Sequence, residues 1–64
     1  MCLSTVMKKS GEENVLLLKN IASVKPEGET LVFTDLMGVR TRLEGKIIDI
    51  DLLENTILIE SIAE

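Results

Sequence analysis

The chain has 64 residues, with eleven acidic and seven basic side chains, a net charge of −4 and a single cysteine, Cys2. This length limits it to one domain, residues 1–64, and the cysteine count excludes a disulfide within the chain. The acidic balance argues against binding of a nucleic-acid backbone as the main activity, because such binding depends on Lys and Arg side chains.

The chain is rich in aliphatic residues and poor in aromatic ones. Hydrophobic residues make up 45% of it, but Phe33 is the only aromatic residue. A chain this short buries only about 60% of its unfolded surface, and it often needs a metal or a second subunit to be stable. We therefore expect part of the aliphatic surface to be buried against a partner.

The sequence predicts a cytoplasmic protein that does not enter a membrane. No basic start followed by an apolar run marks a signal peptide, and no apolar stretch approaches the ~20 residues that span a bilayer. An unpaired cysteine is typical of a reducing compartment.

The first half of the chain alternates with the period of a β-strand. Residues 3–8 alternate between two faces and predict a first strand, which ends at the turn signal "KKSGEEN". The segment "VLLLKNIASVK" follows, and its β-branched residues favour strands with a kink near Asn20. Pro26 and Gly28 then predict a turn at "PEGE".

The second half predicts further strands. "TLVFTDL" is the clearest of them, with Leu31 and Phe33 on one face and Val32 on the other. A turn at "MG" leads into a strand at "VRTRLEG", and "KIIDIDLLENTILIE" predicts a hairpin with its turn near "LEN". A competing interpretation places a short helical turn at "DLLEN".

These elements predict an all-β protein. Strands recur every eight to twelve residues, which indicates a small single-domain barrel or a curled antiparallel meander of about six to seven short strands. We expect the domain to be homodimeric, because a second copy would cover the aliphatic surplus.

Catalysis has little support in the residues. The chain has no histidine to act as a general base or to activate Cys2. Asp49 and Asp51 lie two apart on a predicted strand and could pair, but two solvated acids on an outer face are the simpler interpretation. Met7 and Met37 are better suited to filling gaps in a core or an interface than to binding Cu(I). The sequence therefore predicts a protein that is not an enzyme.

Cys2 is the residue with the most distinctive chemistry. It could be a small buried hydrophobe at the start of a strand, because free cysteine is often buried. However, its sulfur lies within chelate reach of the α-amine of Met1 and of its own amide nitrogen. If Met1 is removed, the amine and the thiol lie on one residue. In both cases the donors are nitrogen and sulfur.

One chain supplies too few such donors for a full coordination sphere. A two-fold dimer that brings two chain beginnings together would supply two sulfurs and at least two nitrogens. Thiolate and nitrogen donors in a plane suit divalent nickel or copper, whereas zinc favours a tetrahedron. Met1 and Cys2 are therefore the candidate metal-binding residues.

Two parts of the chain resemble the CooT family of small nickel-binding proteins. These are the start "MC", followed at once by a strand, and the ending "GKIIDIDLLENTILIE", with its glycine, "DL" pair and final acidic strand. The resemblance covers essentially the whole chain, although the middle matches only in length and in the placement of turns.

The resemblance implies a homodimeric cytoplasmic protein that binds Ni(II). Such a protein would help to supply metal to a nickel enzyme, of which carbon monoxide dehydrogenase is the best-known example, or act with that enzyme's maturation proteins. The essential ligand of the family falls on Cys2. Because the chain has no histidine, backbone nitrogen at the chain start is the expected second type of ligand beside the sulfur of Cys2.

Two alternatives stay open at this point. Small β-barrels often bind RNA, and Arg40 and Arg42 lie on one strand face where they could contact phosphates. Against this, single-stranded RNA sites usually add aromatic platforms, and this chain has only Phe33. The other alternative is a metal-free interaction module that dimerises to bury its aliphatic surface.

Overall fold

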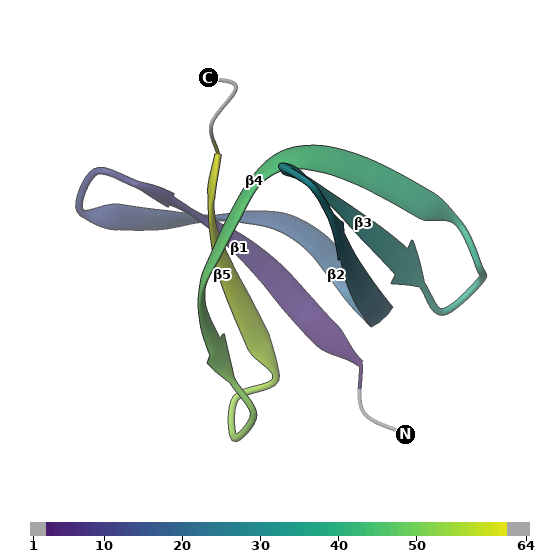
Figure 1. The fold of residues 1–64 in the computed structure, drawn as a ribbon. Helices are drawn as coiled ribbons and strands as arrows, with labels where there is room; N and C mark the ends of the chain where they lie inside the picture. Colours follow the sequence, from purple (N-terminus) through teal and green to yellow (C-terminus); the bar gives the residue numbers. More distant parts are fainter. Residues whose placement is uncertain (1–2, 62–64) are drawn as a thin grey trace.

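Five strands form the fold in the computed structural model, which describes residues 3–61 (Figure 1). They are β1 (Ser4–Ser10), β2 (Glu13–Glu27), β3 (Thr30–Asp35), β4 (Arg40–Asp51) and β5 (Thr56–Ser61). The strands follow one another around a closed barrel in chain order. The all-β prediction is confirmed, but the predicted six to seven strands are wrong, because the described part has five.

The difference in strand number comes from two long strands that bend instead of ending. β2 runs for 15 residues and passes through Asn20, which has a positive φ of 57°. Its first half pairs with β1, and the pairing with β3 begins at Ile21. The sequence correctly predicted a kink at this position, but the strand continues through it.

The second bend lies in β4, which the sequence divided at Gly45. Residues 40–44 of β4 pair with β3, and residues 45–51 pair with β5. A Cβ atom on Gly45 would lie 2.5 Å from the carbonyl oxygen of Glu60, so only glycine permits this close approach of β5. Gly45 is therefore a point of contact inside one strand rather than the end of a strand.

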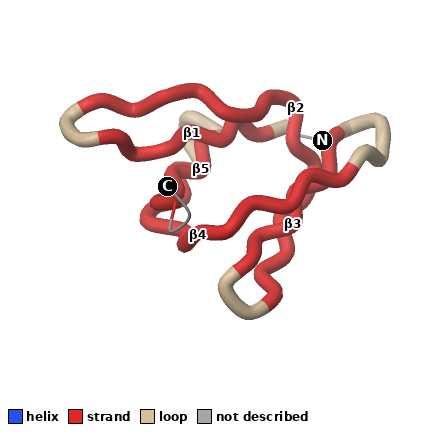
Figure 2. Tube along the Cα trace, turned by 90° about the horizontal axis from the view of Figure 1, so that it is seen from above, coloured by secondary structure: helices blue, strands red, loops and turns tan. Residues whose placement is uncertain are grey.

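The barrel closes through a pairing that the expected antiparallel meander does not contain. β1 pairs with β5 in parallel, with Thr5 opposite Thr56 and Lys8 opposite Ile59. The other four neighbouring pairs are antiparallel. In Figure 2 the chain is seen to close on itself, while the β1–β2 hairpin extends as an arm to one side.

The core lies inside this ring of strands. Its buried members are Val6, Ile21, Leu31, Phe33, Ile57 and Ile59. Leu31 and Phe33 face inward as predicted, and Phe33 is fully buried. Met7 is only half-buried, and its neighbour Val6 takes the core position of β1.

The described residues contain no helix that could cross a membrane. The segment "DLLEN", for which a helical turn was the competing interpretation, is the end of β4 and the hairpin turn that follows it. Its last residue, Asn55, has a positive φ of 54°, which suits asparagine in a tight turn.

Candidate functional site

The predicted metal ligands Met1 and Cys2 lie outside the residues that the structure describes. What it does fix is the point where the chain enters the barrel, at Leu3 and Ser4. In Figures 1 and 2 the start of β1 lies at one end of the barrel, between the β3–β4 loop and the β4–β5 loop. We call this region the entry end.

Backbone hydrogen bonds link the start of β1 directly to the β4–β5 loop and, through β2, to the β3–β4 loop. The amide of Thr5 donates to the carbonyl oxygen of Asn55 in the β4–β5 loop, at 2.9 Å. The amide of Leu36 in the β3–β4 loop donates to the carbonyl oxygen of Asn20, at 3.0 Å. Ile21, the residue after Asn20, pairs with Ser4. The position of Ser4 and Thr5 relative to these loops is thus set by the sheet itself.

The β3–β4 loop is held in shape by one carboxylate. Oδ1 of Asp35 accepts hydrogen bonds from the amides of Met37, at 2.8 Å, and Val39, at 3.0 Å. Gly38 supplies the positive φ of 86° that the tight turn requires. Leu36, Met37 and Val39 are all exposed, and Met37 retains 80% of its accessible surface. The loop therefore presents apolar side chains on an ordered backbone.

The β4–β5 loop has the same design. Oδ1 of Asp51 accepts hydrogen bonds from the amides of Leu53, at 3.0 Å, and Glu54, at 3.1 Å. Leu52 and Leu53 are 81% and 89% exposed, and Ile50 beside them is also exposed. The sequence identified Asp51 only as a surface acid and missed its role in ordering this loop. The signal that could have revealed it is an Asp at the start of a turn.

A small hollow lies at the entry end between β1, β2 and the β4–β5 hairpin. Its volume is about 180 Å³, and its lining includes Ser4, Ile21, Ile50 and Leu52. The one carboxylate that lines it belongs to Asp51, which already accepts two hydrogen bonds. This surface suits apolar contact rather than coordination of a metal.

The described residues do not form a metal site of their own. Within residues 3–61, no group of three or more His, Cys, Asp or Glu side chains could hold an ion. Asp49 and Asp51 are exposed, and the carboxylate of Asp51 has a structural role.

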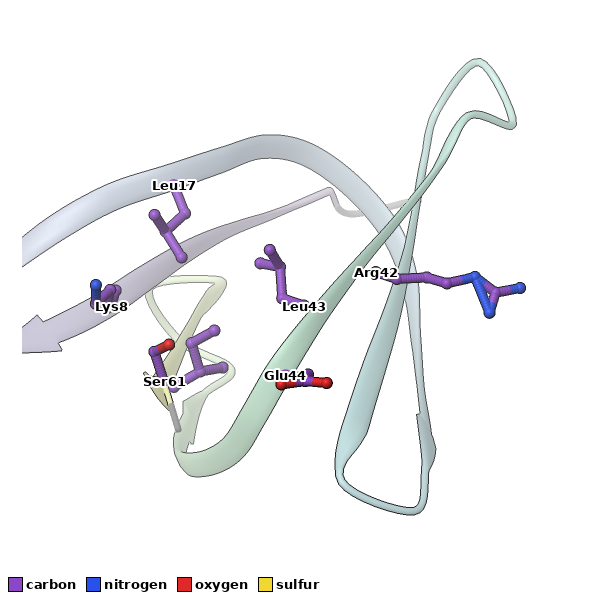
Figure 3. Close-up of a pocket in the computed structure, with 7 residues that line it drawn as sticks. Lys8, Leu17, Arg42, Leu43, Glu44 and Ser61 are labelled. Atoms are coloured by element: carbon purple, nitrogen blue, oxygen red, sulfur yellow. The ribbon is translucent and has the colours of Figure 1, made fainter. Parts of the chain in front are cut away.

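A larger hollow of about 370 Å³ lies under the β1–β2 arm, away from the entry end. Leu17, Leu43 and Ile59 form its apolar wall, and Lys8, Glu44 and Ser61 also line it (Figure 3). The side chain of Arg42, although counted in its lining, extends away from Leu17 and Leu43 in this view. The residues that line this hollow do not form a cluster of reactive groups.

The structure gives only part of what the RNA-binding alternative requires. Arg40 and Arg42 lie on the outer face of β4, opposite Thr34 and Val32 of β3. Phe33 is fully buried and cannot stack on a base. The structure therefore supplies the cationic side chains but not the aromatic platform.

Comparison with known proteins gives matches over nearly the whole chain, from a family model and from solved structures. The family model for the CO dehydrogenase accessory protein CooT matches residues 1–60, a range that includes Cys2. A crystal structure assigned to CooT from Carboxydothermus hydrogenoformans has a TM-score of 0.85 and 25% sequence identity, and the match covers 94% of this chain and 97% of that one. No curated protein matches significantly.

Proposed function

Because the chain belongs to the CooT family of CO dehydrogenase accessory proteins, we propose that it binds Ni(II) as cargo and supports the metallation of that enzyme. The thiolate of Cys2 is the essential ligand in this proposal. The α-amine of Met1 and backbone nitrogen at the chain start are its partners. The supporting observation is that the only cysteine lies two residues before the start of β1, inside the range that the family model matches.

The donor chemistry fits this cargo. Thiolate and nitrogen donors in a plane suit low-spin Ni(II), and the same set could also take Cu(II). Residues 3–61 provide no competing cluster of ligands. The site therefore depends on the chain start.

The second part of the proposal is a homodimer formed through the entry end. A planar ion needs about four donors, and two chain beginnings related by a two-fold axis would supply them. Six exposed apolar residues lie near the start of β1, on the two Asp-ordered loops and the adjoining end of β4: Leu36, Met37, Val39, Ile50, Leu52 and Leu53. Packing this end against its copy would bury these side chains and bring the two Cys2 residues together.

The ordered loops favour such a contact energetically. A loop that is already fixed by the carboxylate of Asp35 or Asp51 loses little conformational freedom when it packs against a partner. Most of the free energy gained by burying the apolar side chains is then available to stabilise the dimer.

The direct test replaces Cys2 with serine and measures nickel affinity by calorimetric titration of protein with its native N-terminus. Cys2→Ser should abolish tight binding while leaving the CD spectrum and the melting temperature unchanged. The matched control is Ser4→Cys in the Cys2→Ser background, which restores a thiol two residues away and should not restore the affinity. Wild-type nickel affinity in Cys2→Ser would refute the assignment of the ligand.

A second variant tests the role of the α-amine. An extension of a few residues ahead of Met1 places the amine elsewhere while Cys2 stays in position. It should weaken nickel binding if that amine is a ligand. Unchanged affinity would show that sulfur acts with other donors.

A further inference from the structure

The outer face of β2, β3 and β4 carries a cationic hollow that the nickel proposal does not use. Its volume is about 250 Å³, and its charged lining consists of Lys25, Arg40, Arg42 and Glu27. Three of the seven basic side chains of the protein thus line one hollow, together with one of its eleven acidic ones. This concentration runs against the net charge of −4.

Strand register fixes how these cations are arranged. One row across the sheet runs from Lys25 through Val32 to Arg42, and the next runs from Ser23 through Thr34 to Arg40. Neighbouring strands lie about 4.8 Å apart and residues two apart on one strand about 6.8 Å apart. The three cationic residues therefore start from backbone positions within about 12 Å of one another.

The floor of the hollow is apolar. Val32 faces outward, opposite to the core residues Leu31 and Phe33, but only 6% of its surface is exposed. Its cross-strand neighbours Lys25 and Arg42 line the same hollow, and the stems of such side chains commonly cover apolar surface. Charges beside a covered apolar surface interact more strongly with a bound anion than charges surrounded by water.

We infer that this face binds an acidic, extended segment of a partner protein, with carboxylates at alternating positions. In an extended segment the side chains two apart point the same way and are about 6.8 Å apart, which matches the spacing of Arg40 and Arg42 along β4. Each guanidinium can hold one carboxylate in a bidentate pair. Lys25 supplies a third positive charge, and the hydroxyls of Ser23 and Thr34 add hydrogen-bonding groups.

Two observations favour a protein segment over a nucleic acid. The only aromatic residue, Phe33, is fully buried, so the face offers no platform for a base. Glu27 in the lining would repel a polyanion with a charge on every unit, whereas a segment with carboxylates at alternating positions can place an uncharged residue beside it. Charge complementarity thus points to a carboxylate-bearing peptide.

The test uses the full chain labelled with ¹⁵N and three probes: a capped peptide of alternating serine and glutamate, its serine–glutamine counterpart, and hexauridylate. The acidic peptide should shift amide resonances in residues 23–27, 30–34 and 40–44, and added salt should weaken the effect. The glutamine peptide should produce no shifts. Because the mapping uses the unaltered protein, it does not depend on the folding of a variant.

Variants then assign the effect to the two arginines. Arg40→Gln/Arg42→Gln should weaken peptide binding about tenfold, whereas Lys9→Gln/Lys19→Gln, which makes the same change in net charge elsewhere, should leave it nearly unchanged. Equal losses in both variants, or no shifts with the acidic peptide, would overturn the inference. Tighter binding of hexauridylate to the same residues would overturn it in favour of a nucleic-acid partner. Nickel binding through Cys2 should be unaffected in every variant.

Discussion

The leucines of the β4–β5 loop offer the sharpest test of the proposed dimer. We predict that Leu52→Ser/Leu53→Ser separates the dimer into folded monomers. Both side chains are more than four-fifths exposed in the single chain, so their removal should change the free energy of unfolding of the monomer by no more than about 0.5 kcal/mol.

The size of the expected effect follows from burial and symmetry. Full burial of a leucine contributes about 1.5–3 kcal/mol, and a two-fold contact includes each leucine twice. If the contact covers about half of each side chain, the four leucines together contribute about 3–6 kcal/mol. Their loss should raise the dissociation constant of the dimer by about 10²–10⁴.

Sedimentation equilibrium, with and without nickel, measures this change, and urea unfolding checks that the variant still folds. The control is Leu16→Ser/Leu17→Ser, which makes the same substitutions at exposed positions on the β1–β2 arm, away from the entry end. The reasoning is refuted if the arm variant dissociates as readily as the loop variant. It is also refuted if the unaltered protein stays monomeric at every concentration, with or without nickel.

Two further predictions concern the barrel and the metal. Gly45→Ala should lower the free energy of unfolding by about 1–3 kcal/mol, because the new methyl group meets the carbonyl oxygen of Glu60. Urea unfolding measures this loss, and a loss below about 0.5 kcal/mol would show that β5 can move aside. Nickel affinity should fall as the pH is lowered, because the thiol, with an ordinary pKa of about 8.5, and the α-amine, with one of about 7.7–8.0, must lose protons to bind. Titrations across this range should show the affinity rising with pH, and a flat profile would contradict thiolate and amine coordination.

Local features of the fold could be predicted from the sequence because they have local causes. The turns at Gly11, Gly28 and Gly38 all have the positive φ that glycine permits. The alternation around Phe33 identified the inward face of β3 correctly. The kink at Asn20 was also predicted.

The number of strands and the closure of the barrel could not be predicted in the same way. Gly45 resembles the end of a strand when only its neighbours in sequence are considered. Glycine is needed at this position because the carbonyl oxygen of Glu60, fifteen residues later in the chain, comes too close for a side chain. The parallel pairing of β1 with β5 joins segments about fifty residues apart and leaves no periodic signal within either one.

The candidate site shows the same division. The family resemblance is confirmed, whereas the choice of Cys2 as a metal ligand stays a prediction from its chemistry and from that resemblance. The loops beside the chain start could not be foreseen, because Asp35 and Asp51 order them through hydrogen bonds that depend on the hairpin geometry. The position of both loops at the entry end depends on the tertiary fold.

Nickel titration of the protein with its native N-terminus, followed by absorption spectroscopy and with molar mass measured on the same sample, tests the central claim most directly. We predict saturation at about one Ni(II) per two chains, low-spin planar absorption with sulfur-to-nickel charge transfer, and the mass of a dimer. Saturation at one ion per monomeric chain, or a nickel spectrum without a sulfur contribution, would contradict the account.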